Sequence, residues 1–346
     1  MEQNMKKEKT IYIVSQLGIS NAGGVEKVSY YLNEILSKNH NVKIITKGKC
    51  NFGKLNNLIQ PLIISLRLRF LKNKFVIGNS WHCFLYPADI SIHHGTSAGI
   101  MEKTGESNMS LKLTAWMEKI SARRARKVMA VSENCKKELT SLYGIPESKI
   151  MVVNNFVDDQ VFKPAENATE AGGENKKVIN VCFSGALLEK KGLERLKSFS
   201  DYMEEYAGRD FLIELNIATN YSKNAEYFQG RQHTHIRTGL TSKEMPDFYR
   251  ENHIMFFPTK YEGFSMAVLE ALSSGLCLVG SHFAVTPEVQ KYDFCHLINS
   301  ETSNEELVNI IINLYQKFAD KKLEIHNQIK NDFGKEQYVR KIEELI

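Results

Sequence analysis

The stretch YEGFSMAVLEALSSG, residues 261–275, decides how this chain is interpreted. Glu262 precedes a glycine, and Glu270, eight positions later, lies in a run that is otherwise apolar or small. The composition of residues 265–274 favours a helix that Ser265 can cap, and its apolar faces predict that it is buried. A buried glutamate needs a partner because desolvating its charge is costly. Glu270 therefore either contacts a ligand that offers hydroxyl groups or has a structural role, and the residue alone favours neither.

Size and composition indicate a globular protein of two domains. The chain has 346 residues, of which 42% are hydrophobic, which is enough for a sizeable core. Six scattered cysteines form no CxxC pair and no metal-ligand spacing, so we expect a reducing, cytoplasmic environment and no metal. The polar, Lys-rich start predicts no signal peptide, and no apolar run has membrane-spanning length. We expect a soluble protein, or one peripheral on the inner face of a membrane.

The charge is uneven along the chain. Residues 1–160 contain 23 Lys+Arg and 13 Asp+Glu, a net +10, whereas residues 161–346 contain 22 and 27, a net −5, which together give the total of +5. A basic N-terminal half suggests contact with an anionic partner, such as a lipid surface or a phosphorylated acceptor, or else a solvated surface without a partner. No nucleic acid is expected, because the basic residues are not interleaved with stacking aromatics.

Residues 58–75 combine an apolar pattern with interleaved Arg67, Arg69, Lys72 and Lys74. An apolar face with a basic fringe can lie on an anionic membrane. A helix packed on a sheet with a basic outer face is the commoner explanation, and the sequence leaves both open.

The N-terminal half is typical of alternating strands and helices. An apolar strand at 11–15, a turn with Gly23 and Gly24, a helix at 25–37 and a strand at 41–46 form a βαβ unit. The glycines could let backbone amides approach a phosphate or could simply form a tight turn, and their spacing is not that of a dinucleotide fingerprint.

A histidine pair ends another predicted strand, at 89–94. His94 would lie on the ligand side of an open α/β sheet, where it could bind hydroxyl groups or transfer a proton. The structural alternative is a histidine that is hydrogen-bonded at the end of its strand.

A polar, aperiodic stretch separates the two halves. We place a linker at 166–177, between an N-terminal domain at 1–165 and a C-terminal domain at 178–330, with a C-terminal helix at 331–346 that could pack back on the N-terminal domain. After the linker, a strand at 178–184 meets a turn from Gly185 to Gly192, whose Lys190 and Lys191 could reach a phosphate. Two such halves predict two doubly wound α/β domains with a ligand cleft between them.

These residues, in this order, resemble the retaining glycosyltransferases of the GT-B fold, specifically glycosyltransferase family 4, the group 1 glycosyltransferases. Glu262 and Glu270, with Gly263-Phe264 between them, are similar to the Glu-x7-Glu motif of that family. Weaker matches extend over nearly the whole chain, at 23–26, 94–96, 131–133, 155–158, 162–164, 185–192, 258–271 and 287–288.

The resemblance implies two Rossmann-like domains that face a central cleft, the first binding the acceptor and the second a UDP- or GDP-linked sugar. It implies no metal and no other cofactor. His94 and Glu262 would be the catalytic contacts to sugar, Glu270 would bind the ribose, and Lys191, aided by Lys190, would neutralise the diphosphate. The remaining donor-binding positions are Gly23, Gly24, Gly185, Gly263, Phe264 and Ser265.

Three positions depart from the family pattern. Ala186 stands where an arginine of the diphosphate clamp is usual, Phe156 replaces a glycine, and Cys277 replaces a proline. The resemblance implies a hexosyltransferase that acts on a glycan or lipid-linked acceptor in cell-surface polysaccharide or lipopolysaccharide synthesis. The alternatives are a sugar-nucleotide epimerase or hydrolase of the same fold, or a non-catalytic glycan-binding member, which the missing arginine would suit.

Overall fold

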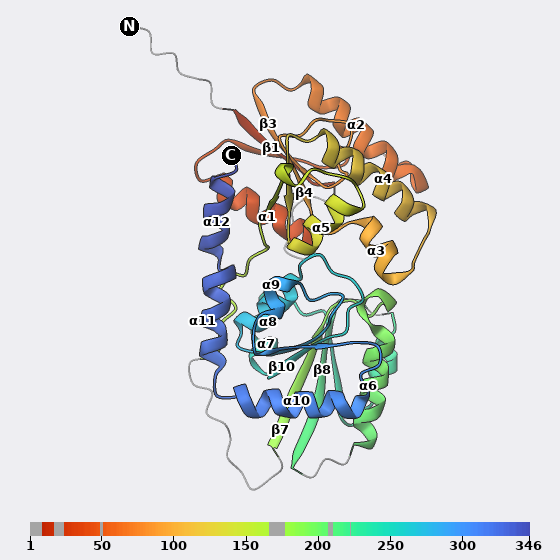
Figure 1. Ribbon diagram of the computed structural model, residues 1–346, viewed down its shortest axis with the longest axis vertical. Coiled ribbons are helices and arrows are strands. Elements are labelled where there is room, and N and C mark those ends of the chain that lie inside the picture. The colour runs from red at the N-terminus through yellow and green to blue at the C-terminus, as the bar shows by residue number, and fades with distance from the viewer. Residues whose placement is uncertain (1–8, 17–23, 49–50, 166–176, 207–209, 222) are drawn as a thin grey trace. The chain divides into compact units, whose positions relative to one another are not determined.

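The computed structural model describes residues 9–16, 24–48, 51–165, 177–206, 210–221 and 223–346 (Figure 1). The chain divides into two compact units, Met1–Asn154 and Asn155–Ile346. Each unit contains one six-stranded sheet in which every strand pair is parallel. The predicted class, two doubly wound α/β domains, is confirmed for the folds of both units.

The first unit has the strand order β2-β1-β3-β4-β5-β6. Its strands are short and apolar because helices cover both faces of the sheet. The strands are β1 Thr10–Val14, β2 Val42–Ile45, β3 Lys74–Asn79, β4 Ile90–His93, β5 Lys127–Ala130 and β6 Ile150–Val152. The helices are α1 Gly24–Leu36, α2 Asn56–Phe70, α3 Ser97–Thr104, α4 Met109–Arg124 and α5 Glu133–Ser141, with 3-10 turns η1 Gly53–Leu55 and η2 Glu147–Lys149.

Right-handed crossovers decide which face each helix covers. The connection from β1 to β2 runs in the opposite direction along the sheet to the connections β2–β3 and β4–β5, so α1 covers one face and α2 and α4 the other (Figure 1). Ile64 and Leu68 of α2 pack with Val14, Ile45 and Val76 in a core cluster over the first three strands.

The second unit has the strand order β12-β11-β10-β7-β8-β9. Its centre is β7, which lies between β10 and β8 and is paired with β8 from Lys177–Phe211 to Ser184–Ala218. The strands are β7 Lys177–Ser184, β8 Phe211–Thr219, β9 Thr234–Thr238, β10 Ile254–Phe257, β11 Cys277–Ser281 and β12 Cys295–Ile298. The helices are α6 Leu193–Glu205, α7 Met245–Arg250, α8 Met266–Ser273, α9 Pro287–Gln290, α10 Asn304–Phe318, α11 Lys322–Phe333 and α12 Lys335–Glu343, with 3-10 turns η3 Glu189–Lys191 and η4 Ala225–Phe228.

The segment 155–165 belongs to the second unit, whereas the sequence placed it at the end of the first. Its aromatic rings and backbone explain the difference. Phe156 stacks on Tyr338 of α12 at 4.5 Å between ring centroids, and the amide of Val157 donates to the carbonyl of Phe333 at 2.9 Å. The carbonyl of Phe162 accepts a bond from Ser273 Oγ at 2.6 Å.

The C-terminal segment 331–346 contains the end of α11 and all of α12 rather than one helix. Its packing against the N-terminal domain stays a prediction, as does the linker role of 166–176, which lies outside the described residues. Within the described ranges, the helices are all too short or too polar to cross a membrane.

Candidate functional site

In the second unit, the loops that follow β7 and β10 are fastened together. The amide of Lys260 donates to the carbonyl of Lys190 at 2.9 Å. Gly192 has a φ of +83°, and a Cβ at this position would lie 2.2 Å from the carbonyl oxygen of Pro258. Only glycine fits such a close approach of two backbones. The glycine turn predicted between strand and helix therefore brings the two lysines to the loop that carries Glu262.

Lys191 and Glu262 form an ion pair between Nζ and Oε2. Their side chains are 27% and 25% exposed, so both remain accessible to a ligand while each compensates the charge of the other. The sequence assigned them to diphosphate and sugar separately, and the structure brings them into direct contact. Gly185, at the start of the same loop, donates its amide to the carbonyl of Ala218 at 3.0 Å.

The buried helix predicted at 265–274 is α8. Ser265 caps it, accepting a hydrogen bond from the amide of Val268 at 3.4 Å. Gly263 and Phe264 precede the cap. Phe264 is fixed on two sides, because its carbonyl accepts from Asn155 Nδ2 at 2.9 Å and its ring packs 5.5 Å from that of Phe333. The first turn of α8 thus has a defined position beside the Lys191–Glu262 pair, in a loop that starts after β10.

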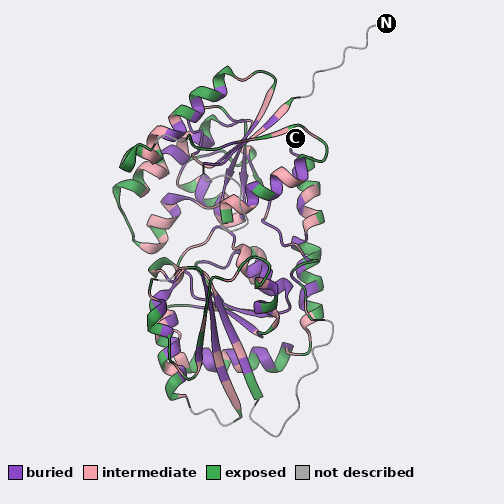
Figure 2. Cartoon of the chain, turned by 180° about the vertical axis from the view of Figure 1, so that it is seen from behind, coloured by how far each residue is buried: buried purple, intermediate pink, exposed green. Residues whose placement is uncertain are grey.

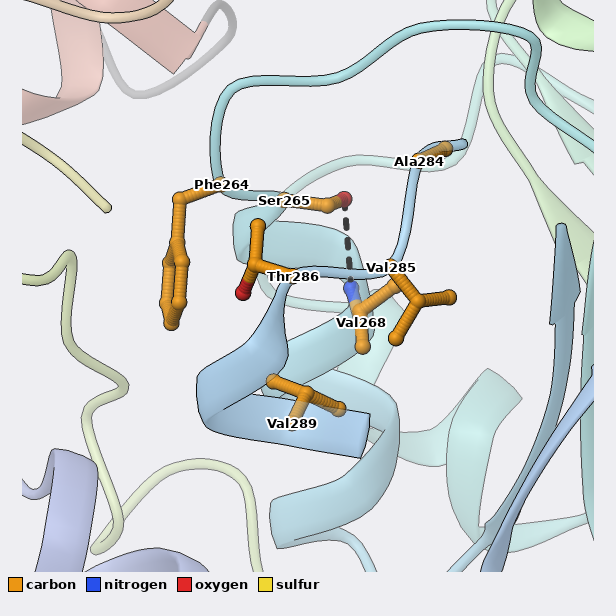
Figure 3. Close-up of a pocket in the computed structure, with 7 residues that line it drawn as sticks. All are labelled: Phe264, Ser265, Val268, Ala284, Val285, Thr286 and Val289. Carbon is orange, nitrogen blue, oxygen red and sulfur yellow. Dashed lines mark hydrogen bonds between the residues drawn. The ribbon is translucent and has the colours of Figure 1, made fainter. Parts of the chain in front are cut away.

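A small cavity separates this first turn from the segment between β11 and α9 (Figure 3). Its volume of about 10 Å³ has room for about one water molecule, so it does not enclose a nucleotide or a sugar. The hydroxyl of Thr286 is buried beside Phe264 and has no hydrogen-bond partner among the described residues. The residues that line the cavity are Phe264, Ser265, Val268, Ala284, Val285, Thr286 and Val289.

Glu270 is buried on α8, as the sequence predicted, with 7% of its surface exposed. Tyr249 of α7 lies close to it. Burial raises the pKa of Tyr249 well above its usual value, and the charge of Glu270 adds to the effect. The Tyr249 hydroxyl lies near the side chain of Ser184, which opposes this rise in pKa, but it makes no well-formed hydrogen bond among the described residues. Sequence reasoning did not find Tyr249, because nothing in the spacing of α7 distinguishes it from an ordinary core aromatic.

In the first unit, His94 follows β4 at the end of its strand. Its Nε2 lies 3.1 Å from Oδ1 of Asn79, whose Nδ2 in turn donates to the carbonyl of Val14 at 3.1 Å and to Ser29 Oγ at 2.9 Å. This chain of bonds ties the histidine to β1, β3 and α1. Burial lowers the pKa of His94 to about 4, so the ring is neutral near pH 7 and can exchange hydrogen bonds without carrying charge.

Two buried glutamates hold the turn after His94, and the sequence did not single them out. Glu118 Oε2 accepts from the amide of Ser97 at 2.8 Å and from the hydroxyl of Tyr143 at 2.5 Å. Glu138 accepts from Thr96 Oγ1 at 2.8 Å and pairs with Lys103 at 3.0 Å. Burial raises the pKa of Glu118 to about 7. Because these bonds are made within the fold, we interpret both residues as supports of the turn.

The two glycines predicted near the first strand have different outcomes. Gly24 is the first residue of α1, and a Cβ there would meet nothing within 4 Å. Gly23 lies outside the described residues. In the described ranges, no three His, Cys, Asp or Glu side chains gather in a way that could hold a metal ion.

Comparison with known proteins matches two family models. The model described as glycosyl transferases group 1 matches residues 165–331, and that described as Glycosyltransferase Family 4 matches residues 86–161. An uncharacterized glycosyltransferase of Methanocaldococcus jannaschii is 24% identical over 63% of this chain and 57% of its own length. One subunit of the human phosphatidylinositol N-acetylglucosaminyltransferase is 22% identical over 92% of this chain and 72% of its own length.

Solved structures show the same fold. A sucrose-phosphate synthase from Thermosynechococcus elongatus superposes with a TM-score of 0.75 at 13% identity and covers 98% of both chains. Anabaena HepE, in complex with UDP-glucose, superposes with a TM-score of 0.66 at 15% identity over 97% of this chain and 98% of its own. With both family models matched in order, the chain belongs to the glycosyltransferase group 1 family and has the GT-B fold.

Proposed function

We propose that this protein is a retaining hexosyltransferase that moves a sugar from a UDP- or GDP-linked donor to a glycan or lipid-linked acceptor. The reaction would serve cell-surface polysaccharide or lipopolysaccharide synthesis at the inner face of a membrane. The Lys191–Glu262 pair at the junction of two strand-end loops carries this proposal. Strand ends of open α/β sheets are the usual place for a ligand.

The donor's diphosphate would compete with Glu262 for Lys191. An ammonium group forms a charge-assisted bond with phosphate as readily as with a carboxylate, and the diphosphate brings more negative charge. The capped N-terminus of α8 adds the positive end of its dipole. When the bond from sugar to phosphate breaks, its electron pair goes to the diphosphate oxygen, and these groups would stabilise that charge. Lys190, on the same turn, would help to neutralise the diphosphate, because position 186 holds an alanine and not an arginine.

Glu262, released from Lys191, would accept hydrogen bonds from the donor sugar. Glu270 would accept bonds from the ribose hydroxyls, with the Tyr249 hydroxyl close to it. Gly263, Phe264 and Ser265 would offer their amides at the start of α8. In the first unit, neutral His94 would contact the sugar on the acceptor side. Gly23, Gly24 and Gly185 would allow close approach of backbone to the donor.

Two comparisons support the choice of donor and acceptor. The Anabaena relative was solved with UDP and with UDP-glucose, which favours a UDP-linked donor. The human relative is named for transfer to a phosphatidylinositol lipid, which favours a lipid-linked acceptor.

Calorimetric titration with UDP, GDP and ADP tests nucleotide binding, and product analysis by NMR tests the reaction. We expect one nucleotide to bind, the Glu270→Ala variant to lower turnover by about two or more orders of magnitude, and the product to keep the donor's anomeric configuration. The matched control is Glu305→Ala on the exposed face of α10. Near-normal turnover in Glu270→Ala would reject its assigned role. Binding of none of the nucleotides would favour a non-catalytic member, and donor consumption without acceptor would indicate a hydrolase or epimerase.

A further inference from the structure

The solvent-facing side of α2 is apolar. One face of this helix packs on the sheet through Ile64 and Leu68. Four other apolar residues recur at intervals of four, three and four, which places them in one stripe on the opposite face. Within this stripe, Ile63 is 43% exposed, Leu66 58% and Phe70 78%. The stripe consists of Ile59, Ile63, Leu66 and Phe70.

Surface helices normally turn polar residues outward, so a second apolar face calls for a partner. In Figure 2 exposed residues appear along the helices of this part of the first unit. The helix packs on the sheet, as the commoner of the two interpretations predicted, and its outer side exposes the apolar stripe together with Arg67 and Arg69. The basic residues lie at its borders: at 100° per residue, Arg67 and Arg69 are about 70° and 90° to either side of the stripe.

The segment of sequence that contains the stripe is basic and has no acidic residue. From residue 35 to residue 88 the chain has nine Lys or Arg and no Asp or Glu. Arg67, Arg69 and Lys72 are all exposed. Lys74 is used within the fold, since it donates to the carbonyls of Leu68 at 2.6 Å and Leu71 at 2.5 Å and so closes the end of α2.

A second helix on this side of the sheet also exposes apolar side chains. α4 lies on the same side of the sheet as α2, as Figure 1 shows. Its Met109 is 80% exposed and its Trp116 is 51% exposed. Tryptophan favours the boundary between lipid headgroups and acyl chains, where its ring is partly buried and its N–H can still find a partner.

We propose that the stripe on α2 docks the first unit onto a membrane surface rich in anionic lipids. Leu66 and Phe70 enter the boundary between headgroups and acyl chains, and Arg67, Arg69 and Lys72 contact lipid phosphates. A second copy of this chain is a poorer occupant, because Arg67, Arg69 and Lys72 of one copy would face the same positive charges of the other. The anionic surface alone satisfies both the apolar stripe and its basic borders.

Docking does not require the transferase reaction, although it would bring the unit assigned to the acceptor close to a lipid-linked substrate. That consequence rests on the proposed function. Lipid binding and nucleotide binding are therefore measured separately on the same full chain, so that either proposal can fail without the other.

The test is co-sedimentation of the full chain with vesicles of equimolar phosphatidylglycerol and phosphatidylcholine, and with vesicles of phosphatidylcholine alone. We expect binding to the anionic vesicles that weakens as salt is raised. The double variant Leu66→Gln/Phe70→Gln should bind at least about tenfold more weakly, and Arg67→Gln/Arg69→Gln should lose most of its salt dependence. The matched control is Leu323→Gln, an exposed leucine (64%) on α11 of the second unit, which should bind like the wild type.

Both substituted side chains of the apolar variant face solvent, so its thermal unfolding and its UDP titration should match those of the wild type. The proposal is overturned if the wild type ignores anionic vesicles, if it binds uncharged vesicles equally well, or if the apolar double variant binds as the wild type does. Sedimentation velocity tests the alternative that a second copy of the chain covers the stripe. If the wild type is a dimer that binds no vesicles, and the apolar double variant is a monomer, the stripe is a self-association surface and the proposal is overturned.

Discussion

Gly192 joins the two loops of the proposed donor site, and replacing it by alanine should loosen both. Its φ of +83° is a conformation that L-residues seldom adopt. A methyl group at this position would lie 2.2 Å from the carbonyl oxygen of Pro258 and 2.7 Å from its carbonyl carbon. These are backbone atoms, so no side-chain rotation relieves the overlap. Either the turn that carries Lys191 or the segment after β10 must move.

The expected loss in the free energy of unfolding has two parts. The left-handed conformation costs an L-residue about 1–2 kcal/mol, and overpacking costs about 1–3 kcal/mol, which suggests a loss near 3 kcal/mol in the free energy of unfolding. Gly230 provides a matched control, because its φ is +71° and a Cβ there would meet nothing within 4 Å. Gly230→Ala should therefore lose the first part alone. In a unit of this size, 3 kcal/mol corresponds to a fall in Tm of roughly 6–12 °C.

Far-UV circular dichroism and calorimetry follow the melting of both units together. Both tryptophans, Trp81 and Trp116, lie in the first unit, so tryptophan fluorescence reports on that unit separately. The Gly192→Ala variant should melt at a lower temperature than Gly230→Ala and should bind UDP more weakly than the wild type. Equal melting temperatures for the two variants would refute the inference that close packing on Pro258 holds the loops together.

Three further predictions follow from single contacts. Lys191→Met should weaken UDP binding about 10- to 100-fold in calorimetric titration, as expected for loss of a bond to a charged group. The control variant is Lys197→Met, because Lys197 pairs with Glu194 on α6, and it should bind UDP as the wild type does. Equal affinities of the two variants would contradict the role of Lys191. Tyr249→Phe should change the stability of the nucleotide-free protein by no more than about 1 kcal/mol in urea unfolding, because the buried hydroxyl lies near Ser184 but makes no well-formed hydrogen bond among the described residues. A larger loss of stability would show that the hydroxyl is firmly bonded. Burial lowers the pKa of His82 and His93 to about 3 and that of His94 to about 4. The unfolded chain therefore binds more protons than the folded one below pH 6.5, the pKa of an unperturbed histidine. The first unit should be most stable above that pH and should lose stability as the pH falls towards about 4. The burial of Glu118 acts in the opposite sense. The variant His93→Gln should reduce the slope of unfolding free energy against pH by about 1.4 kcal/mol per pH unit, measured by urea unfolding with tryptophan fluorescence. An unchanged slope would contradict a neutral His93.

The strands that the sequence predicted are those with an uninterrupted or alternating apolar run, whether they lie inside the sheet, as β1 and β7 do, or at its edge, as β2 does. The strands expected at 11–15, 41–46 and 178–184 correspond to β1, β2 and β7 to within one residue at each end, and the Ser265 cap located α8. The edge strands β9 and β12 were missed, because THIRT and CHLI contain polar residues that face solvent at the margins of the sheet. Periodicity detects a strand by its apolar face, and in β9 and β12 polar residues interrupt that face.

In the candidate site, the sequence predicted the residues but not the contacts between them. Spacing and resemblance pointed to Lys191, Glu262 and Glu270, but the direct pairing of Lys191 with Glu262 joins residues 71 positions apart and needs the folded loops. Asn155, which holds the carbonyl of Phe264, lies 109 positions before it. No local pattern predicts such contacts. The sequence left the packing of α2 open for another reason: a helix that is apolar on two sides does not show from its sequence which side packs on the sheet.

Charge is distributed differently at the candidate residues of the two units. In the second unit, Lys191 and Glu262 are charged, partly exposed and close enough to exchange partners when an anion arrives. In the first unit, burial keeps His94 neutral, and its bond to Asn79 fixes the ring. A charged pair suits the diphosphate, whose charge grows as the sugar leaves, and a neutral histidine suits hydroxyl groups, which need only hydrogen bonds. This contrast supports assigning the donor to the second unit and the acceptor to the first.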